Sequence, residues 1–131
     1  MKKRAIKKID EKHLSQISLS PSNRLTYVYG FSPKKQCMEI ICVSLDIQIN
    51  DDWVTIIRYD NHHDGILHRH TLIAYDNTAD IVDYEGTKRK GDFTKLLRWA
   101  INDIKNNYLM YKHKFLKRNH VFLKGIEIDE Y

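Results

Sequence analysis

The sequence predicts an α+β protein of one domain, in which an antiparallel meander of four to five β-strands precedes a long C-terminal helix packed on one face of the sheet. Apolar and polar residues alternate through residues 38–49, the pattern of a strand with one buried face. Residues 92–117 instead carry apolar residues at helical spacing. The connections between the predicted strands are short, which favours antiparallel neighbours. A chain of 131 residues is long enough for one domain with its own core.

The first segment, residues 1–20, is predicted to be a short basic N-terminal helix or arm. Within it, residues 4–18 carry apolar side chains at roughly helical spacing, and basic residues between them face water. The apolar positions are Ile6, Ile9, Leu14 and Ile17. Turn-forming residues at 20–23 end the segment.

Strand-forming segments follow, separated by turn formers. They are residues 25–29, 38–49, 53–60, 66–75 and a short one at 80–84. In the second segment, one set of alternating apolar residues is expected to face the core: Ile41, Val43, Leu45, Ile47 and Ile49. A polar loop at residues 61–65 joins the third and fourth segments into a hairpin.

The C-terminal helix is predicted to begin after Asp92, which is a suitable N-cap residue. Its apolar stripe consists of Phe93, Leu96, Leu97, Ala100, Ile101, Ile104, Tyr108, Tyr111 and Phe115. A stripe of this length must be buried, and one face of the sheet is the surface available to it. The basic residues expected off the stripe are Lys95, Arg98, Lys105 and Lys112. Residues 120–131 form an acidic tail or a last strand.

The composition narrows the classes of function. With 42% hydrophobic and 30% charged residues, the chain is too apolar for a disordered protein. A net charge of +5 and a sequence pI of about 9.1 fit a polyanionic partner such as RNA, DNA or an acidic protein. Cys37 and Cys42 lack the spacing of a zinc-binding pair, so we expect two small apolar residues rather than a disulfide or a metal site.

No segment has the apolar length of a signal-peptide core or a membrane span. We therefore expect a cytoplasmic protein without a membrane partner. The sequence leaves the oligomeric state open between a monomer and a homodimer.

The residues that can carry chemistry gather on the predicted hairpin. Four histidines fall within residues 62–70, at His62, His63, His68 and His70. Side chains alternate along a strand, so Arg58 shares a face with Asp60, and His68 shares one with His70. A five-residue loop would pair Arg58 with His68 and so place both pairs on the same face, whereas a loop one residue shorter or longer would separate them.

Such a group suits a phosphodiester substrate. Histidine exchanges protons near neutral pH, and a carboxylate can orient a histidine or raise its basicity. Arg58 can hold a phosphate or the charge that develops on it. A metal-independent ribonuclease needs little more, because the RNA 2′-hydroxyl is its own nucleophile. The basic loop with Lys88, Arg89 and Lys90 lies beside a predicted helix N-terminus and can add phosphate contacts.

Each element also has an alternative interpretation. Arg58 and Asp60 can form a structural salt bridge, and the basic loop can be merely solvated. The His68-x-His70 spacing is also that of a metal-binding strand pair, which Asp60 or His62 would complete. We expect no metal and no other cofactor, because no set of four ligands is evident. The protein can also be a non-catalytic nucleic-acid-binding module or a metal-binding interaction module.

The stretch from Arg58 to His63 reads RYDNHH, and His68-Arg69-His70 follows it. This pattern resembles the TumE-like toxins of bacterial and archaeal toxin–antitoxin pairs, over roughly residues 38–75. The resemblance implies a growth-inhibiting toxin that acts on RNA and is neutralised by a cognate antitoxin, usually a helix-turn-helix protein. It implies the site residues Arg58, Asp60, His62, His63, His68 and His70. The short spacer that the family has between the asparagine and the histidine pair is missing here.

Overall fold

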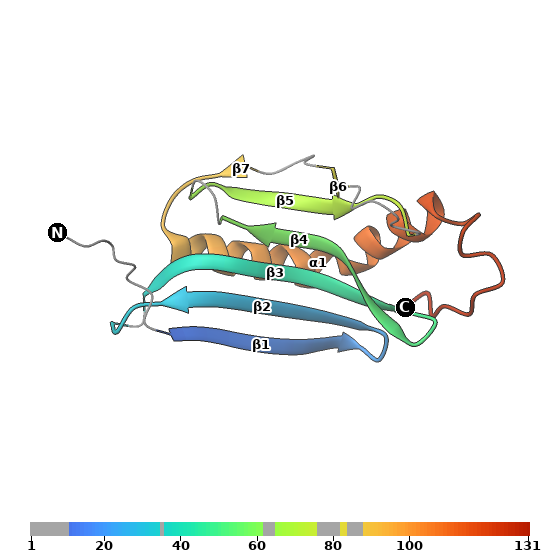
Figure 1. Ribbon diagram of the computed structural model, residues 1–131, viewed down its shortest axis with the longest axis horizontal. Helices are drawn as coiled ribbons and strands as arrows, with labels where there is room; N and C mark the ends of the chain where they lie inside the picture. The colour runs from blue at the N-terminus through green and yellow to red at the C-terminus, as the bar shows by residue number, and fades with distance from the viewer. Residues whose placement is uncertain (1–10, 35, 62–64, 76–81, 84–87) are drawn as a thin grey trace.

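A computed structural model describes residues 11–34, 36–61, 65–75, 82–83 and 88–131. Within these ranges, seven strands form one antiparallel sheet, and a single helix follows them. The elements are β1 (Glu11–Ser20), β2 (Asn23–Phe31), β3 (Cys37–Ile49), β4 (Asp52–Asp60), β5 (Leu67–Leu72), β6 (Val82–Asp83), β7 (Lys88–Arg89) and α1 (Phe93–Arg118). Strands β1 to β6 lie in chain order across the sheet, and β7 also pairs with β5 (Figure 1).

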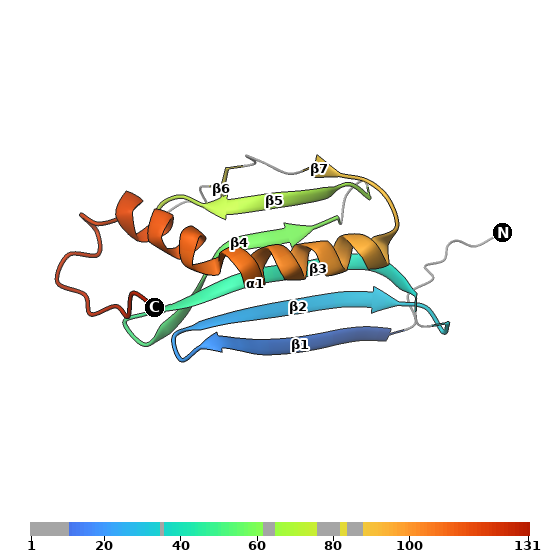
Figure 2. The same cartoon turned by 180° about the vertical axis from the view of Figure 1, so that it is seen from behind.

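Helix α1 lies across one face of the sheet, which confirms the predicted α+β architecture. The helix is behind the strands in Figure 1 and in front of them in Figure 2. It contacts β2, β3 and β4. We call the sheet surface that carries the helix the helix face, and the opposite surface the open face.

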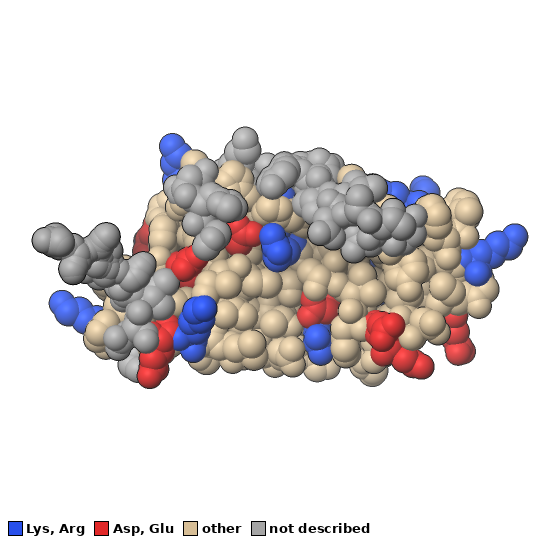
Figure 3. Space-filling view, in the orientation of Figure 1, with Lys and Arg blue, Asp and Glu red and all other residues tan. Residues whose placement is uncertain are grey.

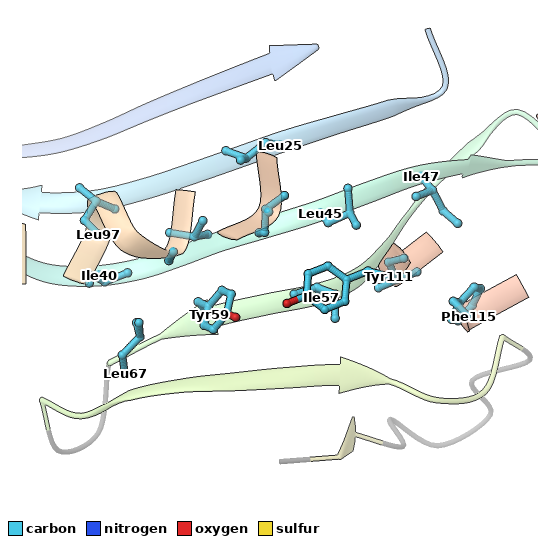
Figure 4. Packing of buried hydrophobic residues seen from close by; sticks show 14 of the residues in the cluster. Leu25, Ile40, Leu45, Ile47, Ile57, Tyr59, Leu67, Leu97, Tyr111 and Phe115 are labelled. Atoms are coloured by element: carbon cyan, nitrogen blue, oxygen red, sulfur yellow. The ribbon is translucent and has the colours of Figure 1, made fainter. Parts of the chain in front are cut away.

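The core fills the space between the helix face and α1. Val43, Leu45, Ile47 and Ile49 of β3 are fully buried there, as the alternation predicts. The helix contributes most of its predicted apolar stripe, namely Leu96, Leu97, Ala100, Ile104, Tyr111 and Phe115. Figure 4 shows side chains from β2, β3, β4 and α1 meeting in this layer. The burial of these apolar surfaces holds the helix on the sheet.

The predicted N-terminal helix is wrong for residues 11–20, which form β1. This strand pairs with β2, with Ile17 opposite Leu25. Ile17 and Leu19 pack against the core at the two-residue spacing of a strand. The polar residues His13 and Ser15 share the face of Ile17 and hide this spacing in the sequence. Residues 1–10 of the predicted basic arm lie outside the described residues.

A β-bulge changes which isoleucine of β3 faces the core. The pairing of β2 with β3 shifts partway along the strands. As a result, Ile40 is fully buried, whereas Ile41, which the alternation predicts for the core, is only partly buried. An extra residue on one strand reverses the facing of the residues beyond it, and simple alternation cannot foresee it.

The start of α1 agrees with the prediction, whereas one lysine near its C-terminal end does not. Asp92 is the N-cap as expected, and its side chain accepts a hydrogen bond from the Thr94 N–H at 3.2 Å. Lys112, predicted to lie off the buried stripe, is fully buried. Its Nζ donates to Ser22 Oγ at 3.3 Å, and that hydroxyl donates to Asp129 Oδ2 at 3.0 Å. Residues 126–131 form a tail without a strand, and its hydrogen bonds with Ser22 and Asn23 hold it beside the start of β2.

Candidate active site

The hairpin of β4 and β5 brings Arg58, Asp60, His68 and His70 onto the open face. The backbone pairs Arg58 with His70 and Asp60 with His68. The predicted pairing of Arg58 with His68 is therefore wrong by two residues. Since a shift of two keeps every side chain on the same face, the four residues still lie together.

Asp60 is the centre of this group, which we call the hairpin cluster. Its Oδ2 lies 3.2 Å from His70 Nε2 and 3.3 Å from Arg58 Nη2. The side chains of Asp60 and His70 are only 8% and 13% exposed, whereas that of Arg58 is 49% exposed. The carboxylate therefore holds an imidazole in place, while the guanidinium remains open to a ligand from solvent.

The backbone beyond Asp60 is anchored to the neighbouring strand. The Asn61 N–H donates to the Ile40 carbonyl at 3.1 Å, and Asn61 Oδ1 accepts from the Ile40 N–H at 2.8 Å. Asn61 is almost fully buried. These two bonds extend the pairing of the chain with β3 past the end of β4, so they fix the position of the cluster's carboxylate.

A second polar group on the open face is structural. Asp46 is almost buried and accepts hydrogen bonds from four side chains of β2, β3 and β4 at 2.7–3.0 Å. The donors are Arg24, Thr26, Ser44 and Thr55. The Arg24 guanidinium also stacks on Trp53, 4.2 Å from the ring centroid. Because its carboxylate is fully occupied by these donors, Asp46 connects the three strands and is not a reactive group.

Charges on the open face are interleaved. Figure 3 shows basic and acidic side chains next to one another over the described part of this face, with uncharged surface between them. A polyanion that binds here therefore depends on individual groups such as Arg58 rather than on a broad basic field.

The three residues of the predicted basic loop have different positions. Lys88 pairs with His68 in the backbone register of β7 and β5, which brings the loop beside the hairpin cluster. Arg89 pairs with Leu67, and its guanidinium stacks on Trp99 of α1 at 4.0 Å from the ring centroid. Arg89 is therefore on the helix face, away from the cluster, and Lys90 is exposed.

The remaining site predictions concern two loop histidines, a metal site and the two cysteines. His62 and His63 lie outside the described residues. Among the residues that are described, no three histidine, cysteine, aspartate or glutamate side chains gather as metal ligands would. Burial raises the pKa of the Cys37 thiol to about 11 and also raises that of Cys42, so neither thiol is a ready nucleophile at neutral pH.

A polar network on the helix face was missed from the sequence. The Tyr59 and Tyr111 hydroxyls both donate to Asp103 Oδ2, at 2.7 and 2.6 Å. Arg69 Nη1 donates to the Tyr111 hydroxyl at 3.1 Å, and Asn107 Nδ2 donates to Asp103 Oδ1 at 2.9 Å. Burial, and then the bonds to Asp103, raise the pKa of both tyrosines, which keeps them protonated as donors. Alternation along β5 puts Arg69 on the opposite face of the sheet from His68 and His70, but its contact with Tyr111 depends on the position of α1.

Comparison with known proteins identifies the family of the chain. Residues 7–121 match the model of the family described as a domain of unknown function, DUF7718, so the chain belongs to that family. No curated protein and no solved structure matches it. In the described part of the chain, no helix is both long and apolar enough to cross a bilayer.

Proposed function

We propose that the protein cleaves RNA without a metal ion, using the hairpin cluster. The observation that carries this proposal is the contact of one nearly buried carboxylate, Asp60, with both an imidazole and a half-exposed guanidinium. A carboxylate that orients a histidine, beside a group that can bind phosphate, is a general acid–base arrangement. His68, opposite Asp60 in the register, supplies a second imidazole on the same face.

The proposed reaction is an internal transesterification. One imidazole takes the proton of the RNA 2′-hydroxyl, whose oxygen then attacks the adjacent phosphorus. The bond to the 5′-oxygen of the next nucleotide breaks, and the other imidazole gives that oxygen a proton. Arg58 binds the phosphate and stabilises the charge that develops on it, while Asp60 positions His70. The products are a 2′,3′-cyclic phosphate and a 5′-hydroxyl.

The wider biological role belongs to the same proposal. We propose a cytoplasmic toxin whose growth inhibition is neutralised by an antitoxin, in line with the RYDN and His-x-His pattern of residues 58–70. The net charge of +5 supports an RNA substrate.

Turnover of single-site variants tests the proposal. In buffer with a chelator, the wild-type protein should cleave RNA, and His68→Ala and His70→Ala should each lower turnover by about 10²–10⁴-fold, the usual scale for a lost acid or base. His120→Ala removes an exposed histidine beyond the end of α1 and should leave turnover unchanged. Equal turnover in all three stable variants would remove the hairpin cluster from catalysis.

A second candidate function is non-catalytic binding of single-stranded nucleic acid. A row of rings lies on the helix face of β1 and β2, with centroids 5.2–6.2 Å apart: His13, Tyr27, Tyr29 and Phe31. Tyr27 and Tyr29 are nearly parallel, with an angle of 9° between their rings. Aromatic rings on a strand are a platform on which unpaired bases can stack.

Fluorescence polarisation with a labelled single-stranded RNA tests this second function. A stacking platform predicts that Tyr27→Leu and Tyr29→Leu weaken binding by about 5–150-fold each, the range for a lost base–aromatic contact. The matched control is Trp53→Leu, which removes an exposed ring from the open face. Binding that falls only in His70→Ala would instead assign RNA contact to the hairpin cluster.

A further inference from the structure

A cavity of about 80 Å³ lies between the strands β4 and β5 and the C-terminal half of α1. It is on the helix face and is therefore separate from the hairpin cluster. Ile57 and Phe115 form part of its apolar wall. Its volume is well below the roughly 300–1,000 Å³ of sites for drug-sized ligands, so only one small group fits inside.

Positive charge dominates the lining of this cavity. The lining includes three cationic residues: Arg69 of β5, whose Nη1 donates to the Tyr111 hydroxyl, and the exposed Lys114 and Arg118, one helical turn apart on α1. Among the described lining residues there is no carboxylate. Asp103, which accepts a hydrogen bond from the lining residue Tyr111, is also occupied by Tyr59 and Asn107.

The cavity also contains a buried hydroxyl without a described partner. Thr71 lines the cavity, and its Oγ1 is buried and makes no hydrogen bond with a described residue. Buried polar atoms normally have a partner, and a ligand with acceptor atoms in the cavity would supply one after the Thr71 side chain turns towards it.

The walls are held in place by the residue that caps the helix. Asn119 Nδ2 donates to the Ile73 carbonyl at 2.8 Å, and its Oδ1 accepts from the Tyr75 N–H at 2.8 Å. Asn119 is almost fully buried. It ties the segment after β5 to the end of α1, so the strand and helix sides of the cavity keep a fixed separation.

We propose that this cavity binds a phosphoryl group. Three cations and a hydroxyl donor around a small space match a tetrahedral oxyanion, which offers several acceptor oxygens and negative charge. The ligand is either free phosphate or the terminal phosphate of a larger molecule whose remainder stays outside. The helix C-terminus disfavours an anion through its dipole, and the clustered cations outweigh this effect.

Isothermal titration calorimetry with inorganic phosphate, at constant ionic strength in chloride, tests the proposal on the full-length protein. We expect a dissociation constant of about 1 mM or lower. Lys114→Ala and Arg118→Ala should each weaken binding by about five- to tenfold, somewhat less than the loss of a buried charge-assisted hydrogen bond because both side chains are exposed. Lys117→Ala is the matched control: it removes an exposed cation of the same turn that does not line the cavity.

A second titration distinguishes the sources of the phosphoryl group. Binding of a 5′-phosphorylated ribodinucleotide, but not of its 5′-hydroxyl form, would support a terminal phosphate as the ligand. Binding of inorganic phosphate alone would support the free ion.

Two results would overturn the proposal. One is the absence of phosphate binding by the wild-type protein in the millimolar range. The other is an equal loss of affinity in Lys114→Ala, Arg118→Ala and Lys117→Ala, which would mean that these cations act only through general charge or the helix dipole.

Discussion

Replacement of the buried Lys112 by methionine is expected to stabilise the protein. Lys112 is fully buried, and its one described hydrogen bond, to Ser22 Oγ, is long at 3.3 Å. The carboxylate linked to it through Ser22, on Asp129, is exposed to solvent and therefore compensates the buried charge poorly. Methionine keeps the length and volume of the chain without the charge. Exchanges of buried charge for apolar side chains commonly stabilise by about 1–4 kcal/mol, and we expect about 1–2 kcal/mol here because one hydrogen bond is lost.

The stabilisation should depend on pH in a defined direction. Burial lowers the pKa of Lys112 from 10.5, with the tail carboxylates acting in the opposite direction. Between the lowered pKa and 10.5, the unfolded chain binds more protons than the folded one, so the stability of the wild-type protein rises with pH in that window. The advantage of Lys112→Met is therefore largest below the lowered pKa and shrinks as the pH approaches 10.5.

Urea denaturation at several pH values measures this difference. Thermal denaturation at neutral pH should in addition show a melting temperature roughly 3–10 °C higher for Lys112→Met. The control Lys105→Met removes an exposed lysine of the same helix and should change the free energy of unfolding by less than about 0.5 kcal/mol. Destabilisation by Lys112→Met, or an advantage that does not shrink towards pH 10.5, would refute the reasoning.

Three further predictions concern the core, the thiols and metal content. Tyr59→Phe should lower the free energy of unfolding by about 1–1.5 kcal/mol, because Asp103 loses one donor and keeps others. In the same denaturation series, Tyr108→Phe, which leaves the hydrogen bonds to Asp103 in place, should change it by less than about 0.5 kcal/mol. Alkylation of Cys37 by iodoacetamide should be slow at pH 7–8 and accelerate towards pH 11, since its pKa is raised to about 11; a fast reaction of the folded protein at pH 7 would contradict this. Elemental analysis of purified protein should find no stoichiometric zinc, and about one metal per chain would favour the His68-x-His70 metal interpretation.

Much of the fold follows from sequence periodicity, because packing on one face imposes it. The two-residue alternation of residues 43–49 and the helical stripe of residues 93–115 both match buried positions. The first strand was predicted as a helix because its two-residue apolar pattern is incomplete. His13 and Ser15 occupy the face of Ile17, but α1 contacts β2, β3 and β4 and leaves this part of the sheet open, so polar residues are tolerated there.

Long-range contacts explain what the sequence could not predict. Lys112 is buried because the tail that contains Asp129 packs beside it and Ser22. No local pattern reports a contact between segments so far apart in the chain. The bulge that exchanges Ile40 for Ile41 is likewise set by the pairing with β2.

The grouping of the hairpin cluster was predictable for a simpler reason. Arg58 and Asp60 share a face by alternation, and so do His68 and His70. Their mutual placement depends only on the parity of the loop, and the pairing differs from the expected one by an even number of residues. The contacts of Asp60 Oδ2 with Arg58 and His70 depend on side-chain conformations, which parity does not determine.

Analysis of the cleavage products tests the central claim most directly. The substrate is a DNA oligonucleotide with one ribonucleotide, incubated with the wild-type protein and a chelator. The account predicts one cut, on the 3′ side of the ribonucleotide, with a 2′,3′-cyclic phosphate and a 5′-hydroxyl, no cut in the all-DNA control, and a loss of about 10²–10⁴-fold in His70→Ala. Cleavage of the all-DNA control, products with 3′-hydroxyl ends, or activity that the chelator abolishes would contradict it.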